Sequence, residues 1–274
     1  MNTIIIIGGG AAGLEAAASL ADSNHSVLLF EKEVGLIQKV RGHYTLFPNF
    51  APAEEVAEKL AEKVVNQPLV TVHVGTEIVS VKAAQGQWEA EDSNGATYQG
   101  DAVLLCTGYE IFDAHRKEEL GFGIYDGIIT SEHLEHLLKE GKVLNTIGET
   151  PKSIVFLQCV GSRDEKTGNH YCSKVCCITA VKQSIDVKRL LPDTDVFCFY
   201  MDLRMSGQFY EELYRQAQEN YGVKFIRGRI SEAAGTFDGK VQIKAEDTLL
   251  GLPLKMSADL LVLMVGMEAS KGTR

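Results

Sequence analysis

The sequence predicts an α/β fold built from two Rossmann-like units. Three observations support this prediction. A β-branched strand at 4–7 leads directly into a glycine-rich turn and a helix, which is how a nucleotide-binding βαβ unit begins. An apolar strand that starts with Asp and ends with Gly occurs twice, at 101–108 and 259–266. The length of 274 residues accommodates two modest domains.

The first unit carries the complete pattern of a dinucleotide-binding βαβ motif. The apolar run at 4–7 is followed by G-x-G-x-x-G at 8–13, an Ala/Leu-rich helix at 14–21 and a second apolar strand at 26–30. Because both flanking strands are present, the motif predicts a dinucleotide site in this unit. The alternative is a glycine turn with a purely structural role.

The residues of this motif have separate expected roles. Gly8 permits the tight turn, Gly10 lets the backbone approach a pyrophosphate, and Gly13 lets the helix pack closely on the strand. Ala12 lies in the same turn, where the N–H groups and the dipole of the helix stabilise phosphate. Glu31 follows the second strand and is placed to accept hydrogen bonds from a ribose.

A further strand end supports the same site. The strand at 101–108 ends in Thr107 and Gly108, and a Thr-Gly pair at such a strand end contacts the flavin nucleotide in two-dinucleotide flavoproteins. Cys106 stands where those proteins have alanine, so we expect it to be a small buried hydrophobic residue. The order of elements between the two motifs resembles FAD-binding rather than plain NAD-binding proteins. That resemblance implies that four further residues line an FAD site, namely Lys32, Gly35, Arg41 and Ile78.

The motif order predicts three segments. They are an FAD-binding Rossmann-like domain at 1–112, a crossing segment at 113–150 and a unit resembling an NAD domain at 151–274. In the last segment a buried strand at 153–158 precedes a helix at 173–190. No G-x-G-x-x-G occurs after residue 150, so we do not expect a nicotinamide site with the usual phosphate contacts.

Four of the six cysteines lie in one short stretch after this strand, at Cys159, Cys172, Cys176 and Cys177. Four thiolates suit Zn²⁺ or an iron–sulfur cluster. Adjacent cysteines are awkward for the spaced pairs of zinc sites, but both can face a larger [4Fe-4S] cluster from the first turn of a helix. The negative charge of such a cluster suits a helix N-terminus. Zn²⁺, buried structural cysteines and a redox dithiol are the alternatives.

The cysteine stretch also carries a resemblance to a known family. Segments 157–164 and 169–177 are similar to the A-type subunit of heterodisulfide reductase and to the related flavoprotein subunits of the quinone-interacting membrane-bound oxidoreductase. Segments 108–113, 200–204 and 246–251 resemble the same family. The resemblance covers nearly the whole chain. It implies that the four cysteines named above hold a [4Fe-4S] cluster beside FAD.

The chain departs from this family in three respects. It has no C-x2-C-x2-C ferredoxin runs, and it has no cysteine motif soon after Phe47 and Pro48. It also ends before the family's later Gly-Asp segment, which closes over the flavin ribityl chain. We therefore expect the first unit to be truncated in its C-terminal part.

These observations predict an FAD-dependent oxidoreductase that acts as an electron-transfer subunit of a heterodisulfide-reductase-like complex. Electrons would pass between FAD and the [4Fe-4S] cluster and on to the other redox subunits. No acid–base constellation in the sequence predicts a catalytic side chain. The alternatives are a self-contained NAD(P)H-dependent FAD disulfide reductase and a Zn-binding or scaffold subunit.

Composition limits the partners and the location. The formal net charge of −10 argues against nucleic-acid binding, which requires a basic face. The N-terminal isoleucines lack a preceding basic region, and no apolar run approaches the ~20 residues that span a bilayer. We therefore expect a cytoplasmic protein without a membrane span. In that compartment clustered thiols more often bind metal or carry out redox chemistry than form disulfides.

Overall fold

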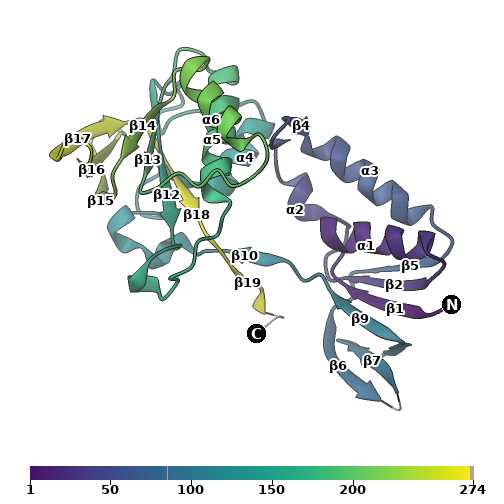
Figure 1. The fold of residues 1–274 in the computed structure, drawn as a ribbon. Helices are drawn as coiled ribbons and strands as arrows, with labels where there is room; N and C mark the ends of the chain where they lie inside the picture. Colours follow the sequence, from purple (N-terminus) through teal and green to yellow (C-terminus); the bar gives the residue numbers. More distant parts are fainter. Residues whose placement is uncertain (85, 272–274) are drawn as a thin grey trace. The chain divides into compact units, whose positions relative to one another are not determined.

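The computed structural model divides the chain into two compact units (Figure 1). The structure describes residues 1–84 and 86–271. Unit 1 consists of Met1–His43, Ala51–Glu110 and the end of the chain from Ala269. Unit 2 consists of Tyr44–Phe50 and Ile111–Glu268. Both units contain a parallel sheet with helices packed on it, so the α/β prediction is confirmed.

The observed division lies near the predicted boundary at residue 112 but assigns three segments differently: Tyr44–Phe50 belongs to unit 2, the chain from Ala269 belongs to unit 1, and 113–150 is not separate. We expected 113–150 to be a separate crossing segment, whereas it belongs to unit 2. It supplies α4 (Ser131–Lys139) and β11 (Ile128–Thr130), and β11 pairs in parallel with β18 (Leu260–Val265). The backbone groups of this short buried strand are satisfied by joining the sheet of the second half.

Unit 1 is built on a four-stranded parallel sheet. Its strands, in sheet order, are β5 (Val70–Val74), β2 (Ser26–Glu31), β1 (Thr3–Ile7) and β9 (Ala102–Leu105). Helices α1 (Ala11–Asp22) and α3 (Ala53–Val65) pack together on one face of this sheet. Small buried side chains such as Ala17 let α1 approach the sheet closely.

A second, antiparallel sheet packs on the remaining face. Its strands are β6 (Ile78–Ala84), β7 (Gln87–Asp92) and β8 (Thr97–Gly100). Successive side chains of β1 alternate between the two faces, so Ile6 joins the core under the helices and Ile5 packs with Phe30 and Ala90. A turn at 93–95 joins β7 to β8, and Gly95 there has a φ of 84°.

Unit 2 is built on a five-stranded parallel sheet. Besides β11 and β18 it contains β12 (Ser153–Val160), β13 (Asp195–Tyr200) and β14 (Lys224–Arg227), in the order β11-β18-β12-β13-β14. Helices α4, α5 (Cys176–Leu190) and α6 (Tyr210–Glu219) cover one face. The other face carries the antiparallel strands β15 (Ile230–Gly235), β16 (Val241–Asp247) and β17 (Leu252–Ala258).

The covering of both faces explains why the central strands of unit 2 are apolar throughout. In β12, Ile154 and Phe156 pack on the helix side, whereas Val155 and Leu157 pack on the side of the antiparallel sheet. This arrangement leaves the carboxyl ends of the strands as the edge at which loops gather. The cysteine stretch begins at the carboxyl end of β12.

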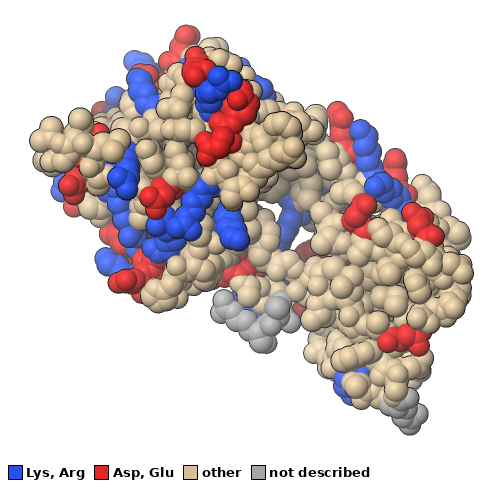
Figure 2. All heavy atoms as spheres, in the orientation of Figure 1, with Lys and Arg blue, Asp and Glu red and all other residues tan. Residues whose placement is uncertain are grey.

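The remaining elements are short. They are α2 (Gln38–Arg41), β3 (Thr45–Leu46), β4 (Ala51–Pro52), β10 (Tyr109–Ile111), β19 (Met267–Ala269) and three 3₁₀ turns at Ala114–Arg116, Glu118–Leu120 and Glu165–Thr167. Strands β10 and β19 pair with each other. On the face drawn in Figure 2, Lys and Arg side chains lie together with Asp and Glu side chains on the lower left part of unit 2.

Candidate functional site

The glycine loop of unit 1, residues 8–13, follows the carboxyl end of β1 and leads into α1. Gly8 has a φ of 115°, and a Cβ there would lie 2.2 Å from the carbonyl oxygen of Cys106. A Cβ at Gly13 would lie 1.9 Å from the carbonyl oxygen of Gly8. Neither position accepts a side chain, because in both cases the obstructing atom belongs to the backbone. These two glycines therefore allow strand, loop and helix to approach each other.

Gly10 differs from these two glycines. A Cβ at Gly10 would meet no heavy atom of the described residues within 4 Å, so the loop presents open space there. Gly10 is the N-cap of α1, and no described side chain caps this helix end. The first N–H groups of a helix need partners from outside the helix, and a phosphate is a suitable one. The loop therefore fits a pyrophosphate.

Glu31 is held beside this loop at the end of β2. Its carboxylate accepts hydrogen bonds from the backbone N–H of Gly9, at 2.6 Å, and of Glu33, at 2.9 Å. Each carboxylate oxygen can accept more than one hydrogen bond, so both can still receive a ribose hydroxyl. The structure thus brings the predicted acidic residue to the glycine loop.

The end of β9 joins the same edge. The N–H of Cys106 donates to the carbonyl of Ile7 at 2.7 Å, so Thr107 and Gly108 follow the strand next to the glycine loop. Gly108 has a φ of 69°. Cys106 packs against the core under α1 as a partly buried residue, and burial raises the pKa of its thiol.

The other predicted contact residues of unit 1 are distributed around this edge. Lys32 is exposed just after β2, and Gly35 lies in the loop that follows. Arg41 ends α2 and forms an ion pair with Glu54. Ile78 begins β6 and packs beside the core of the antiparallel sheet. Of the predicted contact residues, those of the glycine loop, Glu31 and the end of β9 therefore lie together, whereas the others are spread around the edge.

The loop that carries the four cysteines, residues 159–177 of unit 2, has an unusual backbone and is called the cysteine loop below. Cys159 has a φ of 62°, and the pairing of β12 with β18 shifts register between Leu157 and Val160. Such a bulge changes the direction of a side chain at the end of a strand. Arg163 and Lys174, farther along the loop, also have positive φ values, of 54° and 61°. Strained backbone of this kind in non-glycine residues is concentrated at functional sites.

The four cysteines come together around this loop. Cys159, Cys176 and Cys177 are buried, and Cys172 is partly buried. Cys176 and Cys177 are the first two residues of α5. A hydrogen bond joins the side chains of Cys159 and Cys176, and the charge of Cys172 acts on both thiols of the helix.

The electrostatics of these thiols differ from one to the next. The hydrogen bond from Cys176, together with the positive charges of Arg163, Arg204 and Arg229, lowers the pKa of Cys159 to about 7. The same hydrogen bond and burial raise the pKa of Cys176 far above the ordinary value. One thiolate is thus stabilised by cations, while its neighbour keeps its proton in the absence of a metal.

Burial raises the pKa of Cys177 to about 11. Its thiol donates to the side-chain oxygen of Gln158 at 3.2 Å and accepts from the N–H of Arg204 at 3.4 Å. The sulfur of Cys172 accepts from the N–H of Lys174, also at 3.4 Å. Backbone N–H groups that point at sulfur are the contacts that tune an iron–sulfur cluster.

The residue types around the loop bear on which group they could hold. Within the described residues, no three His, Cys, Asp or Glu side chains are arranged as a metal site. Nη1 of Arg163 is buried without a hydrogen-bond partner in the described chain. Four thiols beside such a cation are the residue types that a four-thiolate site requires.

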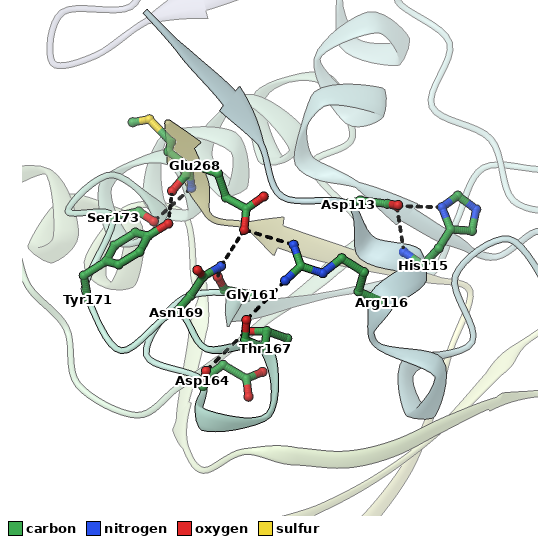
Figure 3. A network of polar contacts seen from close by, with 11 residues as sticks. Asp113, His115, Arg116, Gly161, Asp164, Thr167, Asn169, Tyr171, Ser173 and Glu268 are labelled. Atoms are coloured by element: carbon green, nitrogen blue, oxygen red, sulfur yellow. Dashed lines mark hydrogen bonds and ion pairs between the residues drawn. The ribbon is translucent and has the colours of Figure 1, made fainter. Parts of the chain in front are cut away.

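A polar network braces the cysteine loop, and the sequence did not predict it (Figure 3). The carboxylate of Glu268 accepts hydrogen bonds from Arg116, at 3.0 Å, and from the side-chain amide of Asn169, at 2.8 Å. Asn169 also donates to the carbonyl of Gly161 at 2.9 Å, and Arg116 to that of Thr167 at 3.2 Å. Two sides of the loop are thus tied to one carboxylate.

The second half of the network fixes the part of the loop that precedes α5. The hydroxyl of Tyr171 donates to the carbonyl of Met267 at 2.8 Å. The N–H of Met267 donates to Oγ of Ser173 at 2.9 Å, and Ser173 also bonds to Ser162. No local spacing in the sequence indicates these contacts, since Met267 is about a hundred residues away from its partners.

The comparison with known families concerns the first half of the chain. The sequence model of the family described as pyridine nucleotide-disulphide oxidoreductase matches residues 2–148. The chain belongs to the pyridine nucleotide-disulphide oxidoreductase family. Membership confirms the prediction of an FAD-dependent oxidoreductase with a Rossmann-type flavoprotein fold. It agrees with the glycine loop and with Glu31 beside it.

Relatives within this family support the resemblance found in the sequence. The chain is 32% identical over 357 aligned positions to the A-type subunit of the ferredoxin/F(420)H(2)-dependent CoB-CoM heterodisulfide reductase of Methanosarcina acetivorans, covering 98% of this chain and 45% of the relative. It is 31% identical to the A-type iron-sulfur subunit of the CoB–CoM heterodisulfide reductase of Methanocaldococcus jannaschii, covering 97% and 54%. The similarity to the A-type subunit of heterodisulfide reductase is thus confirmed. The chain spans about half the length of these curated relatives.

Solved structures show the same fold. The thioredoxin reductase of T. acidophilum matches with a TM-score of 0.63 and 21% identity, covering 97% of this chain and 77% of that one. The thioredoxin reductase of Lactococcus lactis matches with a TM-score of 0.65 and 17% identity, covering 97% and 78%. In the described residues no helix is both long and apolar enough to cross a membrane.

Proposed function

We propose that this chain is the flavin- and cluster-binding part of an electron-transfer subunit in a heterodisulfide-reductase-like complex. In this proposal electrons pass between FAD in unit 1 and a [4Fe-4S] cluster in unit 2, and then to partner subunits. Relatives are named as subunits of heterodisulfide reductase, and one is named an iron-sulfur subunit. The chain itself is a flavin-dependent redox protein by family.

One observation carries the proposal. In unit 1 the path from strand to helix, β1 to α1, runs through the glycine loop. In unit 2 the corresponding path, β12 to α5, runs through the cysteine loop instead. The position that binds a pyrophosphate in one unit therefore offers four thiols in the other, and the N-terminus of a helix favours negative charge in both.

The residues of unit 1 have binding roles in this proposal. The open loop at Gly10 and the first turn of α1 receive the pyrophosphate, and Glu31 and Thr107 orient the nucleotide beside it. When bound, FAD exchanges two electrons with one partner and single electrons with another. We assign no side chain of the chain as a proton donor or acceptor in that chemistry.

The residues of unit 2 hold the cluster in this proposal. Its ligands are the thiolates of Cys159, Cys172, Cys176 and Cys177. Arg163 and the uncapped start of α5 offset the negative charge of the site. Metal binding must displace the protons of the two thiols that start α5, because both have raised pKa values.

The test is a cofactor analysis of protein purified without oxygen. We expect bound FAD, together with iron and acid-labile sulfide in equal amounts and an absorption band of an iron–sulfur cluster. Zinc without iron or sulfide would contradict the cluster, and rapid oxidation of NADH or NADPH by the chain alone would favour a self-contained disulfide reductase.

A matched pair of variants then tests the ligand assignment. Cys176→Ala removes a proposed ligand, so it should abolish the iron signal while FAD is retained. Cys198→Ala is the control, because Cys198 is fully buried in β13, where it contacts Ser184. Retention of iron in Cys176→Ala, or equal loss in both variants, would contradict the assignment.

A further inference from the structure

Gln158 carries a buried amide group that is only half paired. It lies in β12, directly before Cys159, and is 4% exposed. Its Oε1 accepts a hydrogen bond from the thiol of Cys177 at 3.2 Å. Its Nε2 is buried and has no hydrogen-bond partner in the described chain. Buried amide N–H groups without an acceptor cost free energy and are rare in folded proteins unless a ligand or water completes them.

The packing of β12 does not account for a glutamine at this position. The neighbours Phe156 and Leu157 are hydrocarbons that enter the cores on the two faces of the sheet. A leucine at position 158 would fill buried space without leaving a donor unpaired. The hydrogen bond of Gln158, in contrast, connects it with the cysteine site. The amide therefore points to a role at Cys177 rather than in the core.

The polar groups around Cys177 suit a protonated thiol. Its Sγ lies 3.2 Å from Oε1 of Gln158 and 3.6 Å from the carbonyl oxygen of Asp202, and both oxygens are acceptors. One donor, the N–H of Arg204, points at the sulfur from 3.4 Å. As a metal ligand the sulfur carries no proton, and an oxygen at 3.2 Å then repels it. Cys177 is 5% exposed, so little water is available to screen that repulsion.

We propose that Gln158 is a positioning residue of the cysteine site, whose amide turns over when Cys177 becomes a ligand, so that Nε2 donates to the sulfur. The proposal rests on the proposed function, in which Cys177 binds the cluster. The proton of the thiol leaves to solvent, and a bond from sulfur to iron replaces the S–H bond.

The turn of the amide costs little. The oxygen and nitrogen of an amide are nearly equal in size, so the turned group fills the same space. The hydrogen bond that breaks is the one that Cys177 gives up with its proton, and Nε2 leaves no acceptor behind. Together with the N–H of Arg204, the turned amide gives the sulfur two donors. Donors of this kind stabilise the more negative, reduced form of a cluster and so raise its potential.

The test is the midpoint potential of the cluster in whole chain purified without oxygen, measured by redox titration with EPR detection. Gln158→Leu removes the donor and should lower the equilibrium constant for reduction about tenfold, which is about 59 mV for one electron. Gln158→Glu separates donor from acceptor. An ionised carboxylate cannot donate and a protonated one can, so the potential of this variant should rise toward that of the wild type as the pH falls.

Gln183→Leu is the matched control for removal of a buried glutamine. Gln183 is 0% exposed in α5, and its Nε2 donates at 2.7 Å both to the carbonyl of Ser131 and to Glu135. Its replacement should lower the urea midpoint of unfolding of the metal-free chain and leave the cluster potential unchanged. Gln158→Leu should have the opposite pattern, since it removes an unpaired donor and Asp202 can still accept from the thiol.

Three results would overturn the proposal: equal potentials in wild type and Gln158→Leu, an equal shift in Gln183→Leu, or a potential of Gln158→Glu that does not change with pH. Loss of iron in Gln158→Leu but not in Gln183→Leu would support the positioning role, and Gln158→Glu then supplies the potential. Iron and sulfide are measured on every sample. A wild-type chain without them contradicts the proposed function itself, whereas a loaded chain with unshifted potentials contradicts only the role of Gln158.

Discussion

Gly10 and Gly13 allow the role of the glycine loop in FAD binding to be separated from its role in folding. A Cβ at Gly13 would lie 1.9 Å from a backbone oxygen, whereas one at Gly10 meets no described heavy atom within 4 Å. Gly10 also has a φ of −79°, which alanine adopts without strain. The same replacement, glycine by alanine, should therefore have opposite consequences at the two positions.

The expected magnitudes follow from these distances. Gly13→Ala should lower the free energy of unfolding by about 3 kcal/mol, since backbone rather than a flexible side chain must move. Gly10→Ala should change this free energy by less than about 1 kcal/mol, because alanine restricts the unfolded chain but caps the start of α1 less well than glycine. Gly10→Ala should nevertheless weaken FAD binding at least about tenfold, or about 1.4 kcal/mol, because its methyl group occupies the space that the pyrophosphate needs.

Two assays check this prediction. Urea unfolding of the flavin-free protein, followed by circular dichroism, gives the free energies of unfolding. Quenching of flavin fluorescence during titration gives the Kd for FAD. Wild-type affinity in Gly10→Ala would refute the placement of the pyrophosphate at this loop. A loss of stability in Gly10→Ala as large as in Gly13→Ala would refute the structural distinction between the two glycines.

Two further predictions concern unit 2. In the metal-free protein the pKa of Cys159 is lowered from 9.0 to about 7, so the folded state favours its thiolate. The resulting stabilisation is complete above pH 9 and is lost as the pH falls through about 7. The difference in the free energy of unfolding between wild type and Cys159→Ala should therefore shrink over that range. Parallel curves of this free energy against pH would contradict the prediction. Lys182→Met should lower the free energy of unfolding by about 3–5 kcal/mol, because it leaves the buried carboxylates of Glu135 and Asp186, at 2.7 and 3.1 Å, without their cation. The control is Lys142→Met at an exposed position, which should change the free energy of unfolding, measured with urea, by less than about 0.5 kcal/mol.

Both candidate sites could be predicted from the sequence because their signals are local. The glycine motif, the strands around it and Glu31 all lie within one βαβ unit, and the structure brings them to one edge of the sheet. The predicted helix at 173–190 begins three residues later, at Cys176. The difference arises because the loop before it continues through the positive φ of Lys174, which a helix cannot contain.

Other features could not be predicted from sequence patterns. Lys182 lies in the middle of α5 and is 2% exposed, although lysine is ordinarily exposed. Its burial depends on Glu135 from a different helix. The hydroxyl of Thr45 donates to Asp186 at 2.7 Å, so the segment Tyr44–Phe50 belongs to unit 2 although the chain around it belongs to unit 1. No periodicity in the sequence indicates contacts of this kind between distant segments.

The sequence by itself determined where the candidate sites lie along the chain, at the glycines of the first unit and the cysteines of the second. It could do so because turn conformation and ligand spacing are encoded by neighbouring residues. The tertiary structure alone decided what surrounds them. Arg204 and Arg229 follow β13 and β14. They act on Cys159 because the sheet order places β13 beside β12 and β14 beside β13, with their carboxyl ends at one edge. Contacts of that kind depend on strand order, which adjacent residues do not specify.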